Sequence, residues 1–192
     1  LTATPNLATD TVSGVGPATS ALKVTLASCS STSCPPWVMT DGAGNYTAGP
    51  FLYQTQEWIS GTWTLITHTY DIVAGNTGQV YYTNPDFNNV YINYAAPQVQ
   101  VQENGRLVNG LVSVGGYSVT VTLKDMTGTV KSSVMTWPDA GLRYQVNLTA
   151  TIAPGDTVQV TAGGTTTAIF VDPLTGQVDP VNDRVIGTGP AN

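Results

Sequence analysis

The sequence carries few charges, and those it has are dispersed. Only 9% of the 192 residues are charged, and six Lys and Arg against 12 Asp and Glu give a net charge of −6. Binding to nucleic acid or to an anionic membrane surface requires clustered cations, so we expect neither nucleic-acid partners nor membrane insertion. No apolar run approaches the roughly 20 residues that span a bilayer. Low charge together with many β-forming and turn-forming residues indicates an extracellular protein, either secreted or held at the cell surface.

Metal-binding and redox residues are also scarce. The chain has one histidine, His68, and two cysteines, Cys29 and Cys34, in the polar loop CSSTSC. A tetrahedral metal site needs four such ligands, so neither a metal nor another cofactor is expected. In an oxidising compartment the two cysteines are predicted to form a disulfide that closes this short loop.

No arrangement of residues predicts catalysis. Asp71 follows His68 in the segment HTYD, but the chain has no G-x-S-x-G elbow that would supply an activated serine. Glu57 and Asp71 could in principle face each other as the two carboxylates of a glycosidase. Two carboxylates among twelve acidic residues are no signal by themselves, so the sequence predicts a non-enzymatic protein.

What the chain has in quantity is alternating β-strand pattern. Apolar and polar residues alternate in Leu22–Leu26, Val90–Tyr94, Tyr117–Leu123 and Thr157–Val160, and turn residues lie between them. Gly, Pro and β-branched residues interrupt every stretch that has helical spacing. The sequence therefore predicts an all-β protein built of antiparallel sandwiches or barrels.

The end of the chain repeats its beginning. TDTVSGVGPAT, residues 9–19, and NDRVIGTGPAN, residues 182–192, share six residues, with Asp10 and Asp183 lying 173 positions apart. This indicates one period of a tandem array followed by the opening strand of the next period. The predicted contacts between repeats involve Asp10, Gly14, Pro17, Asp183, Gly187 and Pro190.

A second repeat divides the long period in two. The order V-x-G, strand, M-T, Gly turn and strand occurs in both halves, with Met39 corresponding to Met135, Tyr46 to Tyr144 and Gly44 to Gly141. A break near Pro97 separates the halves. We therefore predict a first sandwich in residues 1–96, a second in residues 97–171, and a linker with the next opening strand in residues 172–192.

An aromatic insertion distinguishes the first half. Gly49 to Thr69 has no counterpart in the second half and is predicted to form a hairpin about Ser60-Gly61. Tyr53, Trp58 and Trp63 in this segment are candidates for stacking on sugar rings, as in a carbohydrate-binding module that recognises a cell-surface glycan. The alternative is that the tryptophans are cross-strand partners that pack against the sandwich or a neighbouring copy.

Two further sets of residues are weaker candidates. Asp172, Asp179 and Asp183 could supply oxygen ligands for calcium at a junction between repeats, although their spacing fits no EF-hand loop. Asn45-Tyr-Thr and Asn147-Leu-Thr match the glycosylation acceptor pattern.

The repeated unit resembles a known family. The order D-x-V-x-G, then alternating Val, then Asp41-Gly42-Ala43-Gly44-Asn45-Tyr46, then a Gly turn, is similar to the immunoglobulin-like and carboxypeptidase-regulatory-like repeats of bacterial surface proteins. The resemblance implies two tandem immunoglobulin-like β-sandwiches without catalytic residues, used for spacing, stacking and adhesion. The partners are then neighbouring copies of the same repeat, and strand addition by the terminal segment could join one unit to the next.

Overall fold

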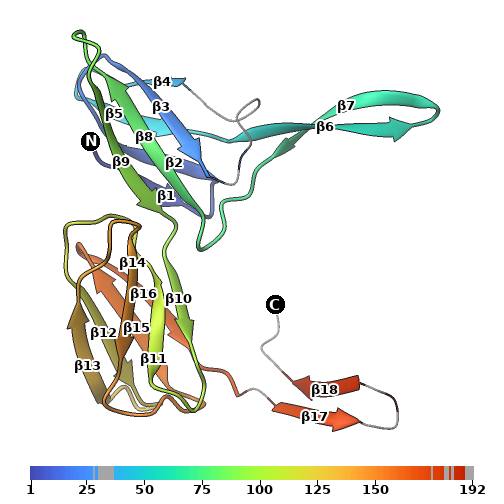
Figure 1. Ribbon diagram of the computed structural model, residues 1–192, viewed down its shortest axis with the longest axis vertical. Helices are drawn as coiled ribbons and strands as arrows, with labels where there is room; N and C mark the ends of the chain where they lie inside the picture. Colours follow the sequence, from blue (N-terminus) through green and yellow to red (C-terminus); the bar gives the residue numbers. More distant parts are fainter. Residues whose placement is uncertain (28, 30–36, 174, 180–181, 183, 189–192) are drawn as a thin grey trace. The chain divides into compact units, whose positions relative to one another are not determined.

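The fold is all-β, as the sequence predicts. The computed structural model describes every residue except 28, 30–36, 174, 180–181, 183 and 189–192 (Figure 1). The described residues form 18 strands and no helix, and the strands of both four-stranded and both two-stranded sheets pair in antiparallel fashion. None of them therefore belongs to a helix that could span a membrane.

The first sandwich consists of a three-stranded and a four-stranded sheet. The smaller sheet has the order β1 (Thr4–Asn6), β2 (Thr11–Val15), β5 (Asn45–Ala48). The larger has the order β4 (Trp37–Met39), β3 (Ala21–Leu26), β8 (Thr77–Thr83), β9 (Asn89–Ala95). Alternation along each strand directs one set of side chains into a common core. The core includes Val12, Leu22, Val24, Tyr46, Phe51, Ile72, Val80 and Tyr94.

The second sandwich repeats this arrangement strand for strand. Its three-stranded sheet has the order β10 (Gln98–Val101), β11 (Leu107–Leu111), β14 (Arg143–Asn147). Its four-stranded sheet has the order β13 (Val130–Thr136), β12 (Val119–Lys124), β15 (Thr157–Ala162), β16 (Thr165–Phe170). The predicted pair of antiparallel sandwiches is thus confirmed. The second core includes Val108, Val119, Val121, Leu123, Tyr144, Ile152 and Val158.

Two pairs of strands lie outside these sheets. The strands β6 (Leu52–Ile59) and β7 (Thr62–Thr69) form one two-stranded sheet, and β17 (Thr175–Asp179) and β18 (Arg184–Thr188) form another. By compactness the chain divides into two units. The first comprises Leu1–Gln98, Leu111–Tyr117 and Pro138–Arg143, and the second comprises Val99–Gly110, Ser118–Trp137 and Tyr144–Asn192.

The Asp-containing hairpin turns correct one detail of the expected alignment. In each sandwich the carboxylate of the first turn residue accepts hydrogen bonds from the backbone two and four positions on, from Asp41 in one and Asp139 in the other. The left-handed residue at the fourth turn position is Gly44 (φ 86°) in the first turn and Leu142 (φ 66°) in the second. The predicted equivalence of Gly44 with Gly141 is therefore wrong by one residue. Burial of the Leu142 side chain offsets its backbone strain.

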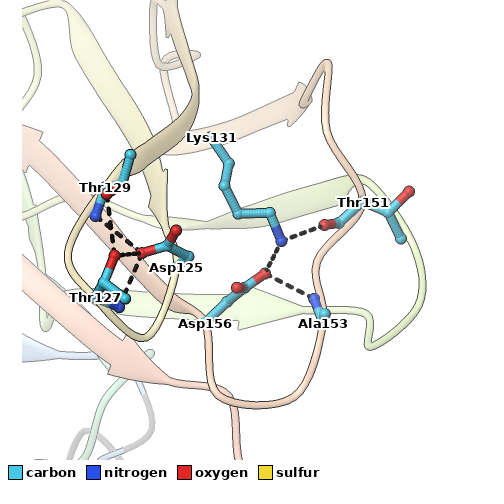
Figure 2. A network of polar contacts seen from close by, with 7 residues as sticks. All are labelled: Asp125, Thr127, Thr129, Lys131, Thr151, Ala153 and Asp156. Carbon is cyan, nitrogen blue, oxygen red and sulfur yellow. Dashed lines mark hydrogen bonds and ion pairs between the residues drawn. The ribbon is translucent and has the colours of Figure 1, made fainter.

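A polar network fastens β13 to the turn before β15 (Figure 2). Lys131 Nζ lies 2.6 Å from Asp156 Oδ2, and it also donates to Thr151 O at 3.2 Å. The same Asp156 oxygen accepts from the backbone nitrogen of Ala153 at 2.8 Å. Asp156 is only 4% exposed, and its buried charge is therefore compensated by one cation and one backbone donor.

Candidate functional site

The aromatic insertion forms the predicted hairpin. The strands β6 and β7 pair along their whole length, and Ile59 faces Thr62 across the turn. Ser60 and Gly61 both have positive φ, 52° and 87°, as a two-residue turn of type I′ requires. The right-handed twist of such a turn matches that of the strands it joins, so this short segment specifies its own register.

The two tryptophans of the hairpin form an exposed cross-strand pair. Trp58 and Trp63 face each other directly, with ring centroids 5.3 Å apart and an edge-to-face angle of 67°. Their side chains remain 61% and 64% exposed. The cross-strand pairing considered from the sequence is present, whereas burial of the rings against the sandwich does not occur among the described residues.

Strand alternation separates Tyr53 from this pair. Side chains alternate between the two faces along a strand, and Tyr53 is odd-numbered whereas Trp58 on the same strand is even-numbered. Their side chains therefore lie on opposite faces of the hairpin. Tyr53 instead stacks on His68, with centroids 5.1 Å apart, and meets Tyr70 edge-on. The three candidate glycan-binding rings are thus not brought together.

The Trp face of the hairpin carries amide groups beside its rings. Gln54, Gln56 and Leu65 lie on this face by their register with Trp58 and Trp63, and Leu65 is 56% exposed. Gln54 Nε2 donates to Thr67 Oγ1 at 3.3 Å. Apolar rings next to uncharged hydrogen-bonding groups are the composition that suits a polyhydroxylated neutral ligand.

A second aromatic surface lies on the first sandwich, outside the hairpin. On the outer face of the four-stranded sheet, Trp37, Lys23, Tyr81 and Tyr91 occupy facing positions on successive strands. The rings of Tyr81 and Tyr91 are 5.8 Å apart, and Trp37 is 66% exposed. Trp37 was not predicted to take part in it, because these residues come from four separate segments and meet only through strand register.

The single histidine, His68, lies next to Glu57 and not next to Asp71, the carboxylate that a Ser-His-Asp triad would use. His68 Nε2 lies 2.8 Å from Thr55 Oγ1 and 3.4 Å from Glu57 Oε1, all on one face of the hairpin. Asp71 contributes to no such contact among the described residues. This arrangement is a partly exposed polar cluster, in which the histidine and its neighbours satisfy one another.

The remaining sequence candidates have the following positions. No group of three or more His, Cys, Asp or Glu residues within the described ranges could hold a metal ion. Asp179 lies on β17, whereas Asp183 lies outside the described residues. Cys29 packs against the first core, but Cys34 lies outside the described residues, so the disulfide stays a prediction. Asn147 is exposed on β14.

Asn45 is exposed but engaged. Its Nδ2 atom donates to Asp41 Oδ2 at 3.0 Å, within the turn that precedes β5. Hydrogen bonds from the side chain and backbone of Asn45 also hold the pKa of the Asp41 carboxyl below its ordinary value. Glycosylation of Asn45 or Asn147 stays a prediction.

Gly14 and Asp10, two of the residues predicted to contact a neighbouring repeat, make close contacts inside the first sandwich. Tyr46 Oη donates to the backbone carbonyl of Thr2 at 2.6 Å, and it crosses directly over Gly14. A Cβ atom at position 14 would lie 2.9 Å from that hydroxyl and would overlap the Thr2 carbonyl. Asp10, with φ 53°, accepts from the backbone nitrogen of Ile72 at 2.8 Å. The contacts of Gly14 and Asp10 therefore hold the β1–β2 hairpin in place against the rest of the first sandwich.

The hairpin β17–β18 has the same register as the hairpin β1–β2. Pro5 faces Val12 in the first hairpin, and Val178 faces Val185, each 173 positions further on, in the last. The neighbouring residue pairs of the two hairpins correspond with the same offset of 173 positions. The strand β18 begins and ends at the positions that are equivalent to the first and last residues of β2. The two similar sequence segments therefore share their strand register, whereas the tandem array itself stays a prediction. Because Asp183 is outside the described residues, its equivalence with Asp10 stays a prediction.

Comparison with known proteins adds one remote likeness. No protein-family model matches the chain, and no curated protein sequence matches it. One solved structure that aligns with it is entitled "Biofilm associated protein - BSP domain". The alignment has 17% identity and a TM-score of 0.32, and it covers 90% of this chain but only 29% of the other. A likeness of this size assigns neither fold nor function, so both are argued from the chain's own residues.

Proposed function

We propose that the chain is a non-enzymatic structural repeat of an extracellular stalk, adhesin rod or filament. The observation that carries this proposal is the recurrence of the opening hairpin 173 residues later with unchanged strand register. In a chain of such periods, each hairpin of this kind opens the first sandwich of its own period, as β1–β2 does here. Successive periods are then joined by the short segment Val171-Asp172-Pro173-Leu174, and a short proline-containing connection restricts bending more than a flexible linker does.

The same hairpin would join units by strand addition. In the first sandwich β2 is flanked by β1 on one side and β5 on the other. Among the described residues β18 has β17 as its partner, and the position that β5 occupies beside β2 is where the next unit would pair.

Electron microscopy of a chain that contains several consecutive 173-residue periods tests this proposal. Straight rods whose length increases by a constant step per period are expected. Isolated beads on a flexible tether would contradict it, because successive periods would then be free to bend at their connections.

A second candidate function is binding of a neutral glycan at the Trp face of the hairpin β6–β7. The exposure of both Trp58 and Trp63 favours it, since a purely structural pair would gain from burial. The test is retention on insoluble polysaccharides and a glycan array. Trp58→Ala and Trp63→Ala should lose binding, whereas Tyr53→Ala, on the opposite face, serves as the matched control.

A further inference from the structure

The first sandwich shows what the β1–β2 hairpin recognises. The strand β2 pairs with β5 so that Val12 faces Ala48 and Gly14 faces Tyr46. Tyr46 is 4% exposed, and its hydroxyl reaches across Gly14 to the carbonyl of Thr2. The contact requires a glycine in β2 and a backbone carbonyl in the segment that leads into β1.

The last hairpin has a glycine at the position equivalent to Gly14 and backbone at the position equivalent to Thr2. Residues 173 positions beyond Thr2 and Gly14 are Thr175, the first residue of β17, and Gly187 in β18. Gly187 is exposed, so its backbone is accessible to a tyrosine hydroxyl. With β18 in the register of β2, Gly187 would face Tyr46 and Val185 would face Ala48 of another first sandwich.

The segment after β2 identifies which sandwich is the partner. Gly16 N donates to Gly44 O at 2.8 Å, and the carbonyl of Pro17 accepts from Thr40 Oγ1 at 2.5 Å. The sequence Gly16-Pro17-Ala18 recurs as Gly189-Pro190-Ala191. The corresponding residues after β11 in the second sandwich are Val112-Ser113-Val114. In the second sandwich Val112 N donates to Leu142 O at 3.0 Å, which is the counterpart of the bond from Gly16 to Gly44, so the contact of Pro17 with Thr40 is the one that distinguishes the first sandwich. Because the same Gly-Pro-Ala sequence follows the last hairpin, we take the partner surface to be that of a first sandwich, formed by β5 and the turn around Thr40 to Gly44.

We propose that the β17–β18 hairpin of one copy docks on β5 of the first sandwich of a second copy, in the place that β1–β2 holds within that copy. This inference rests on the proposed repeat function and names its partner and its contact residues. Docking between separate chains is an exchange, in which the incoming hairpin replaces the resident one during folding. Because the resident hairpin is tethered to its sandwich, it competes at a high effective concentration. Exchange between chains therefore requires a high protein concentration.

Disulfide trapping between two full-length variants tests the proposal. Ala48→Cys is made in one chain and Val185→Cys in another, and the two are unfolded together and refolded at high concentration under oxidising conditions. Facing residues on antiparallel strands have Cα atoms close enough for a disulfide. The expected product is a heterodimer in which peptide mapping finds the two introduced cysteines linked to each other.

Two controls keep the result specific. Gly176→Cys in place of Val185→Cys moves the thiol to β17, which β18 would separate from β5, and the linked heterodimer should be lost. Gly187→Val in the Val185→Cys chain should also abolish the link, because a side chain there would collide with the Tyr46 hydroxyl. The proposal is overturned if the Val185→Cys chain gives no more linked heterodimer than the Gly176→Cys chain does. It is also overturned if Gly187→Val leaves the yield of linked heterodimer unchanged.

The outcome is separable from the test of the repeat itself. Rods formed by a single chain of several periods, together with no link between separate chains, would refute exchange between copies and leave the proposed repeat function standing. Flexible beads from the long chain would refute the repeat function directly.

Discussion

The hydroxyl of Tyr46 donates a 2.6 Å hydrogen bond to the carbonyl of Thr2 by passing over the bare Cα of Gly14. Three segments of the first sandwich, the start of the chain, β2 and β5, meet in this single contact. Because the hairpin β17–β18 reproduces both the register and the glycine, the same contact becomes the expected joint between units.

Gly14→Ala should destabilise the first sandwich. The added methyl group overlaps the Thr2 carbonyl and crowds the Tyr46 hydroxyl, a kind of overpacking that typically costs about 1–3 kcal/mol. The measurement is the free energy of unfolding in denaturant. Gly42→Ala is the matched control, since no atom lies within 4 Å of the Cβ that it adds. Equal stability of the two variants would show that the joint is not tightly packed.

The free energy of unfolding should fall at alkaline pH because the buried Tyr46 hydroxyl resists ionisation. Burial raises the pKa of Tyr46 to about 12 from its ordinary value of 10.0. Between these two pH values the folded state keeps a proton that the unfolded state has lost. The stabilisation that comes from burying protonated Tyr46 is therefore fully present below pH 10 and is lost as the pH rises toward 12. Tyr46→Phe should be less stable at neutral pH and should lose less stability across this window. Identical pH profiles for the two proteins would contradict the assignment.

Phe87→Gly should stabilise the protein. Phe87 occupies a hairpin turn with φ 61° and is 88% exposed, so it has backbone strain without compensating burial. Glycine removes a left-handed penalty of about 1–2 kcal/mol and is expected to raise the melting temperature after its own entropy cost. Gly128→Ala, at φ 86° in another open turn, is the inverse control and should lower it. A lower melting temperature for Phe87→Gly would mean that the ring makes a stabilising contact.

Lys131→Met should destabilise the second sandwich selectively. The substitution leaves the buried Asp156 carboxylate with the Ala153 backbone nitrogen as the remaining donor shown in Figure 2, at an expected cost of about 1–3 kcal/mol. Lys124→Met, which alters another strand lysine of the same sandwich, is the control. Hydrogen exchange resolves the effect by strand, and slowed or unchanged exchange in β13 and β15 would contradict it.

The sequence predicts most where the signal is local. Turn chemistry alone located the hairpin at Ser60-Gly61, because Gly61 tolerates the positive φ that a two-residue turn requires. It failed where tertiary burial overrides local preference: Leu142, not Gly141, takes the left-handed position because its side chain is buried.

Cross-strand relationships explain the other misses. Tyr53 was grouped with Trp58 and Trp63 by proximity in sequence, although strand parity places it on the opposite face of the hairpin. Trp37 was overlooked because its neighbours Tyr81 and Tyr91 come into line with it only through three strand registers. Register between distant strands depends on the packed core, which no local pattern encodes.

Hydrogen exchange of the β18 amides tests the central claim most directly. The measurement compares the 192-residue chain with one in which a second copy of residues 20–96 follows Asn192. If β17–β18 is the opening hairpin of the next sandwich, the added strands will pair with β18 and its amides will become as protected as those of β2. Exchange rates in β18 that are the same in both chains would contradict the account.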